Sequence, residues 1–388
     1  MTKLIEDFTK RVAGSISSIP TLANALDINL SEIENLLNTP ADQRYKEKFI
    51  EKKHGGVRKV YNPSALVRKI QQRIINRIFK PLVDWPFFVY GSIPKSNGQP
   101  AKDYVAAANV HAGAGSLLKM DIKDFFDNIQ REVVFDVFFD FFKYPYPVSE
   151  ILTDICCRDD RLCQGALTSS YLAALCIFDV EAKMVKRIEK KGVTYTRYVD
   201  DITISSKNRS YDFSYVEKVV EEVLMSKDLP VNKGKTSVIN LTSKPLLVHG
   251  LRVNTSNARL PIAEVKRIRA AVQHLEVASR EPNYITLPTY REEFNKCMGR
   301  VNKLARVGHI QHSALVNRLK RIRPKSTRSD LYVAIQMLKI IRRTSQQRRQ
   351  HYFFKKQCAQ AKTLLTLIKK NNKYSRRAAI LLNYLRKI

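Results

Sequence analysis

The spacing of hydrophobic positions changes several times along the chain, and each change marks an expected structural element. Residues 1–40 carry leucines and isoleucines at a helical period, which predicts short helices. Residues 45–61 favour two strands joined by a glycine turn, and residues 65–79 favour a strongly basic helix. From Pro261 onward the pattern is almost entirely helical.

The middle of the chain predicts a small sheet interleaved with helices. Residues 116–122 form a short apolar run typical of a buried strand, and a further strand is expected over residues 231–239. β-Branched and aromatic residues crowd residues 193–205, which predicts a β-hairpin with Asp200 and Asp201 at its turn. The pattern as a whole indicates an α+β protein.

Three acids fall at the ends of two of these expected strands, namely Asp121, Asp200 and Asp201. Neighbouring carboxylates are costly unless a cation holds them, and Mg²⁺ prefers such oxygen ligands. Two metal ions about 4 Å apart can activate an attacking hydroxyl and stabilise a leaving pyrophosphate. The backbone carbonyl of Ile122 is a natural further ligand. A solvated turn with two aspartates is the alternative interpretation.

The strongly positive net charge of the chain indicates which class of molecule it binds. Its 388 residues include 68 Lys and Arg against 36 Asp and Glu, a formal net charge of +32. Such an excess indicates a polyanion, most simply nucleic acid, with an anionic membrane surface as the alternative. No apolar run is long enough to span a membrane. The six cysteines show no Cys-x-x-Cys spacing, so reduced thiols and a cytoplasmic protein are expected.

Three motifs follow one another in an order that resembles a known family. They are Met-Asp-Ile-Lys-Asp-Phe-Phe at residues 120–126, Gln164-Gly165, and Tyr-Val-Asp-Asp at residues 198–201. In this order they resemble the palm motifs of reverse transcriptases. The resemblance covers roughly residues 22–320.

Among reverse transcriptases, the chain is most similar to the retron enzymes. These carry an Asn-Ala-x-x-His signature and a later Val-Thr-Gly signature. Residues 107–111 and 248–250 correspond to them, and each departs at one position, with Ala107 in place of Asn and His249 in place of Thr.

The resemblance implies a right-hand polymerase with fingers, a palm built on an antiparallel sheet, a helical thumb and a helical C-terminal region. The domains it implies are an N-terminal helical element (1–44), fingers with a family-specific insertion (45–115), a catalytic palm (116–255), a thumb (256–325) and a basic helical extension (326–388).

The resemblance also assigns roles to single residues. Asp121, Asp200, Asp201 and the Ile122 carbonyl would hold two Mg²⁺ ions. Lys235, in an Asn-x-x-Lys-Thr pattern, would neutralise or protonate the departing pyrophosphate, unless it is an ordinary surface lysine. The residues expected to surround the incoming dNTP are Arg58, Arg68, Ile122, Phe126, Gln164 and Gly165.

Phe126 falls where the family has an aromatic ring that blocks a ribose 2′-OH; a core phenylalanine is the alternative. His111 and His249 are each expected either to contact nucleic acid or to lie in the core. The other residues expected to contact nucleic acid are Tyr198, Arg348 and Arg349.

Retron enzymes use one cognate structured noncoding RNA as both template and primer. They start from a 2′-OH of an internal guanosine and yield a branched RNA–DNA hybrid. The hybrid and enzyme commonly join an effector protein in anti-phage defence. The partners implied are therefore that RNA, its DNA product, dNTPs and an effector protein, with no membrane. The alternatives are another bacterial reverse transcriptase, such as an intron-encoded enzyme, and a non-catalytic RNA-binding scaffold.

Overall fold

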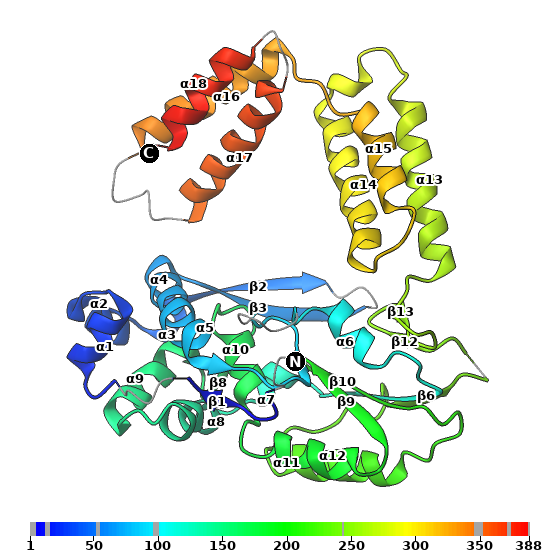
Figure 1. Cartoon of the computed structure of the whole chain (residues 1–388). Helices are drawn as coiled ribbons and strands as arrows, with labels where there is room; N and C mark the ends of the chain where they lie inside the picture. The colour runs from blue at the N-terminus through cyan, green and yellow to red at the C-terminus, as the bar shows by residue number, and fades with distance from the viewer. Residues whose placement is uncertain are drawn as a thin grey trace. The chain divides into compact units, whose positions relative to one another are not determined.

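The computed structural model divides the chain into two compact units, Met1–Arg259 and Leu260–Ile388 (Figure 1). It describes residues 5–11, 16–51, 55–95, 101–242, 244–344, 352–370 and 374–386. Within these ranges, no helix is both long enough and apolar enough to cross a membrane.

The first unit begins with the short helices that the periodicity predicts. Ser18 caps the first of them by accepting a hydrogen bond from the backbone N–H of Thr21. A two-stranded ladder then joins the start of the chain to a segment far along it. The elements are β1 (Thr9–Lys10) paired with β4 (Val83–Asp84), α1 (Ile19–Leu26), α2 (Leu30–Leu37) and α3 (Ala41–Arg44).

The expected hairpin and basic helix follow and are confirmed. Strands β2 (Tyr45–Glu51) and β3 (Val57–Pro63) pair antiparallel along their whole length. The helix after them continues through a π-helical turn, and its parts are α4 (Ala65–Ile74), η1 (Ile75–Phe79) and α5 (Lys80–Leu82).

A five-stranded sheet forms the centre of the first unit, in the order β11-β6-β10-β9-β5. All neighbours are antiparallel except β5 and β9. The strands are β5 (Val89–Tyr90), β6 (Ser116–Asp121), β9 (Val193–Tyr198), β10 (Asp201–Ser206) and β11 (Ser237–Asn240). The strand expected over residues 231–239 is therefore shorter than predicted. It starts only at Ser237, because backbone bonds from Lys235 and Thr236 to the Asn232 carbonyl close a turn first.

Helices cover the buried face of this sheet, and α11 and α12 lie side by side on it (Figure 1). The helices are α6 (Tyr104–Val110), α7 (Phe125–Asn128), α8 (Arg131–Asp136), η2 (Val137–Phe141), α9 (Tyr146–Cys156), α10 (Ser169–Leu175), α11 (Glu181–Glu189) and α12 (Ser214–Met225). Two short ladders complete the unit: β7 (Cys157–Arg158) with β8 (Arg161–Leu162), and β12 (Leu247–Val248) with β13 (Leu251–Arg252). All six cysteines are free thiols, as the sequence predicts.

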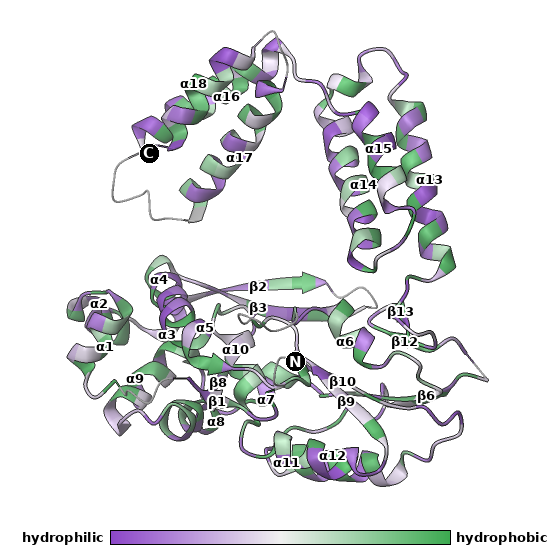
Figure 2. Ribbon diagram, in the orientation of Figure 1, coloured by the Kyte–Doolittle hydropathy of each residue, from purple (hydrophilic) through white to green (hydrophobic). Residues whose placement is uncertain are grey.

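The second unit is helical and contains two separate hydrophobic cores. The hydropathy colouring shows apolar and polar sides alternating around its helices (Figure 2). The first core joins α13 (Ile262–Ala278), α14 (Pro288–Arg306) and α15 (His312–Arg321), with the short η3 (Tyr284–Thr286) against it. The second joins α16 (Arg328–Arg343), α17 (Tyr352–Lys369) and α18 (Ser375–Arg386). The gap between the cores falls near the expected division between residues 256–325 and 326–388, although the assignment of these segments as thumb and extension stays a prediction.

Candidate active site

The central sheet brings the three predicted acids to one edge. Asp201, the first residue of β10, lies directly opposite Asp121, the last residue of β6. Asp200 immediately precedes Asp201 in the turn between β9 and β10. Residues directly opposite each other in a ladder share one face of the sheet, so Asp121 and Asp201 point to the same side. The convergence expected from the sequence is confirmed.

The turn that carries Asp200 is strained and is held by its neighbours. Val199 has a positive φ of 60°, which is unfavourable for a β-branched side chain. Its backbone N–H donates to the Tyr90 carbonyl at 3.2 Å, and the N–H of Ile122 donates to the Asp200 carbonyl at 3.1 Å. Such strain persists only where the surroundings fix the backbone. The structure therefore holds the tip of the hairpin against both β5 and β6.

Negative charge at this edge is poorly compensated. Burial raises the pKa of Asp200, and the charge of Asp121 raises it further. Burial likewise raises the pKa of Asp201, with additional contributions from Asp200 and Asp121. Lys235 neutralises part of this negative charge, since its Nζ lies 2.8 and 3.0 Å from the two carboxylate oxygens of Asp121. That hydrogen bond raises the pKa of Lys235.

The Asp121 carboxylate is also fixed by the turn before β11. Asn232 Nδ2 donates to Asp121 Oδ2 at 3.3 Å, and the Asn232 backbone N–H donates to the Asp121 carbonyl at 2.7 Å. The Asn-x-x-Lys-Thr pattern thus places both its amide and its lysine on the first acid.

The donor set fits a hard divalent cation in its chemistry, because it consists of carboxylates that repel one another. In the described part of the chain, however, no three acidic, histidine or cysteine side chains lie in an arrangement that could already hold a metal ion. The Asp121 carboxylate forms an ion pair with Lys235.

The residues expected around the nucleotide lie on several elements. Arg58, exposed on β3, is close enough for its charge to oppose the raised pKa of Asp200. Arg68 on α4 donates to the Asn62 side chain at 2.6 Å. Ile122 is buried immediately after β6. Phe126 on α7 is half-buried and packs against Phe125, with ring centroids 5.8 Å apart.

The Gln164-Gly165 loop lies against the β2–β3 hairpin. The backbone N–H of Tyr61 donates to the Gln164 carbonyl at 2.7 Å. Gly165 has φ +114°, and a Cβ there would lie 2.4 Å from the Tyr61 carbonyl oxygen. The glycine is therefore required by the close approach of the Tyr61 backbone.

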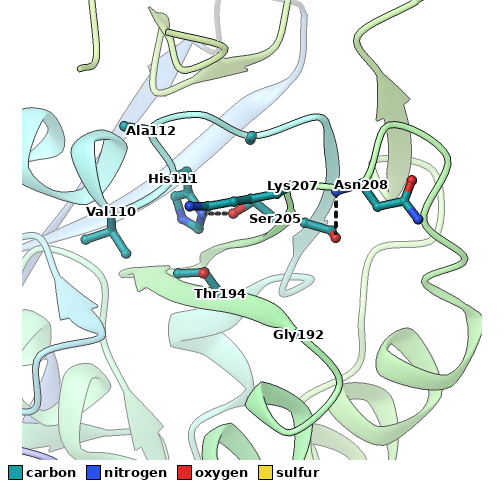
Figure 3. A pocket seen from close by; sticks show the side chains of 10 residues that line it. Val110, His111, Ala112, Gly192, Thr194, Ser205, Lys207 and Asn208 are labelled. Carbon is teal, nitrogen blue, oxygen red and sulfur yellow. Dashed lines mark hydrogen bonds between the residues drawn. The ribbon is translucent and has the colours of Figure 1, made fainter. Parts of the chain in front are cut away.

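His111 lies in the core, which is one of the two positions left open for it, and a contact with nucleic acid is wrong for this residue. Its side chain is 1% exposed. Nδ1 lies 2.7 Å from Ser205 Oγ (Figure 3). Nε2 lies 2.7 Å from Thr196 Oγ1, so both ring nitrogens are engaged within the protein.

His249 is half-buried and its ring packs on Tyr198, with centroids 4.6 Å apart. Its backbone has φ 47°, and its Nε2 is buried with no hydrogen-bond partner in the described part of the chain. Tyr198 lies opposite Asp201 in the hairpin, so residues 248–250 contact the hairpin beside the acids. Contacts of Tyr198 and His249 with nucleic acid stay predictions. Arg348 and Arg349 lie outside the described residues.

Two residues of the site were not expected from the sequence. Lys119 lies two positions before Asp121, opposite Thr203, and its charge opposes the raised pKa of Asp201. Side chains two positions apart in a strand point to the same face, so the spacing of Lys119 and Asp121 could have predicted that Lys119 lies on the face of the acids. Arg197 lies on the buried face, where its guanidinium makes 2.5 and 2.7 Å bonds to Glu181.

Comparison with known proteins identifies the family. Residues 50–281 match the model for reverse transcriptase (RNA-dependent DNA polymerase). The chain is also similar to the Retron Ec48 reverse transcriptase of Escherichia coli, with 44% identity over 328 residues, 84% of this chain and 80% of that protein. The chain belongs to the retron-type reverse transcriptases. This membership confirms both the expected α+β polymerase fold with a helical C-terminal region and the RNA-directed DNA polymerase activity.

More distant similarities accompany this match. The Retron Se72 reverse transcriptase of Salmonella heidelberg is 27% identical over 316 residues, 80% of each protein. Among solved structures, telomerase from Candida tropicalis with a fragment of telomeric RNA aligns at a TM-score of 0.43 and 13% identity, over 89% of this chain and 64% of that chain.

Proposed function

We propose that this retron reverse transcriptase copies one cognate structured noncoding RNA, using it as both template and primer, and yields a branched RNA–DNA hybrid. The observation that carries the catalytic part is the direct pairing of Asp121 with Asp201, with Asp200 beside them. A sheet edge with three mutually repelling carboxylates is suited to binding cations together with the phosphates of a nucleotide.

Two Mg²⁺ ions bound by Asp121, Asp200, Asp201 and the Ile122 carbonyl would activate the attacking hydroxyl and stabilise the leaving pyrophosphate. The residues of the chain supply the rest. Arg58 and Arg68 orient the triphosphate by charge-assisted hydrogen bonds. Phe126 excludes a ribose 2′-OH by its bulk.

Lys235 has two roles in this proposal. It neutralises Asp121, with which it forms a 2.8 Å ion pair. Its side chain is 64% exposed, so it is free to turn toward a bound pyrophosphate and donate a proton there.

The C-terminal extension supports the RNA partner. Residues 326–388 contain 16 Lys and Arg and a single acid, Asp330. That acid is used internally, since it caps α16 through Thr327 and pairs with Arg291. No other acid in residues 326–388 is present to pair with the basic side chains. Structured RNA is bound through its phosphates and 2′-hydroxyls, which suits such a basic segment. An effector protein that joins the complex in anti-phage defence belongs to the same proposal by family membership.

The test is to purify the protein from its own cells and to sequence the nucleic acid bound to it. The proposal predicts one structured RNA joined through a 2′–5′ branch to a DNA copy of itself, and debranching enzyme should release the DNA. The Asp200→Asn/Asp201→Asn variant should copurify with the same RNA and no DNA. A mixture of unrelated RNAs without a branch would contradict the proposal.

A further inference from the structure

One buried side chain contacts both strands of the catalytic hairpin, on the face opposite α11. His111 follows α6 directly, and its two ring nitrogens reach one hydroxyl on each strand of the hairpin, Thr196 on β9 and Ser205 on β10. Thr196 pairs with Thr203, and Ser205 pairs with Thr194, so the imidazole spans the ladder diagonally. The bond to Ser205 is visible in Figure 3.

The hairpin face that His111 covers is also the face that carries the acids. Side chains alternate along a strand, so Ser205, Thr203 and Asp201 point to the same side of β10. Ser205 lies four positions after Asp201, about 13 Å along the strand. His111 therefore holds the hairpin behind Asp201 without reaching the reacting atoms.

His111 is itself rigidly mounted. Its neighbour Asn109 accepts a hydrogen bond from the Ala258 backbone N–H at 2.8 Å. The N–H of Gly113 donates to the carbonyls of Val253 and Thr255 at 2.7 and 2.9 Å. The backbone is thus anchored both before and after His111. The imidazole therefore has a fixed position against the two strands.

The ring is neutral at working pH. Burial, together with the positive charges of His249 and Lys119, lowers the pKa of His111 to about 3. A neutral imidazole has one N–H donor and one acceptor nitrogen. It therefore accepts from one hydroxyl and donates to the other, a pairing that neither a cation nor an apolar ring reproduces.

We propose that His111 is a positioning residue, which fixes β9 against β10 so that the strained Val199-Asp200 turn presents Asp200 and Asp201 correctly to Asp121. The need for such a clamp comes from the turn. Val199 is held at a positive φ that it would leave if the strands were free to shift. A misplacement of about 1 Å in a catalytic group can cost about 100-fold in rate.

The structure also provides a way to test the clamp with small molecules. A cavity of about 340 Å³ adjoins His111, and Thr194, Ser205 and Lys207 also line it (Figure 3). Removing the imidazole by His111→Ala joins its space to this cavity. Added imidazole can then restore the donor and the acceptor, whereas 1-methylimidazole restores only the acceptor.

The experiment measures dNTP incorporation on a primed RNA template by the full chain. His111→Ala should lower kcat about 10–100-fold, with little change in the KM for dNTP. Imidazole should restore much of the loss, and 1-methylimidazole should not. His274→Ala, which removes an exposed histidine on α13, serves as the matched control and should leave kcat unchanged.

Should His111→Ala fail to fold, Ser205→Ala and Thr196→Val each remove one partner and keep the ring. Each should lower kcat, and the double variant should be impaired by less than the product of the two. Wild-type kcat in the folded His111→Ala variant, or equal rescue by the two imidazoles, would overturn the proposal. Failure of the wild-type enzyme to incorporate dNTP would instead count against the polymerase assignment itself.

Discussion

Asp201 and Asp121 are direct partners across β10 and β6, although they lie far apart in the sequence. Their carboxylates share one face of the sheet, and Asp200 adds a third at the adjoining turn. Among the described residues, Lys235 alone forms an ion pair with Asp121. This arrangement concentrates negative charge in a strongly basic protein, which is unfavourable for the metal-free fold and useful for binding cations.

The acids should therefore destabilise the metal-free protein. Since the pKa values of Asp200 and Asp201 are raised, the charged forms cost folding free energy at neutral pH. That cost is fully present above the raised pKa and disappears as pH falls toward the unfolded value. Asp201→Asn should raise Tm by a few degrees in EDTA, as measured by scanning calorimetry.

Magnesium separates this effect from a general change in stability. Mg²⁺ should raise the Tm of the wild-type protein and should have a much smaller effect on the Asp201→Asn variant. A lower Tm for the variant in EDTA, or an equal response to Mg²⁺, would contradict the electrostatic interpretation.

The buried face of the same hairpin depends on the Arg197–Glu181 pair. Both side chains are fully buried, and Tyr195 also donates to Glu181 at 2.9 Å. Arg197→Met would leave the carboxylate buried without its cation, so a loss of about 3–5 kcal/mol in unfolding free energy is expected. Denaturant unfolding measures it. Lys186→Ala, which removes an exposed pair with Glu6, should change stability by less than about 1 kcal/mol.

Phe126 is the predicted barrier to ribonucleotides. Replacing its ring by a methyl group in Phe126→Ala removes the bulk that would collide with a 2′-OH. Incorporation of rNTP relative to dNTP should rise by about 10–100-fold, the scale of a steric discrimination of ~1–3 kcal/mol. Single-nucleotide incorporation kinetics test this. Phe135→Ala, at a neighbouring aromatic on α8, is the control; an equal rise there would point to general loosening of the palm.

The C-terminal extension should bind RNA through exposed lysines on α17. Lys355→Glu/Lys356→Glu reverses two charges that lie on its exposed surface. Affinity for the cognate RNA should fall, and the slope of log K against log salt should decrease by about 2. Filter binding at several salt concentrations measures both. Lys183→Glu/Lys190→Glu, on α11 and at its C-terminal end, changes the net charge equally. A matching loss there would show that only total charge matters.

The sequence predicted the catalytic edge well because its signals are local. A run of β-branched residues on both sides of two acids predicts a hairpin with the acids at its turn. A short apolar run that ends in an acid predicts a strand with that acid at its end. The hairpin, β6 and the convergence of Asp121 with Asp201 are confirmed for this reason.

Long-range packing could not be read in the same way. A histidine such as His111 has the same local sequence whether it faces RNA or two buried hydroxyls, and only the fold decides between them. Nothing in the sequence around Gly165 identifies the Tyr61 backbone as the group that packs against it. The Arg197–Glu181 pair depends on how α11 lies under β9, which no spacing along the chain encodes.

The most direct test of the central claim is primer extension with Mg²⁺ by the Asp121→Asn variant, which changes the acid on the separate strand and keeps its shape. If Asp121 acts with Asp200 and Asp201, DNA synthesis should fall by at least about 1,000-fold while RNA binding and Tm are maintained. Synthesis within about tenfold of the wild-type rate would show that the carboxylates paired across β6 and β10 do not form the catalytic centre.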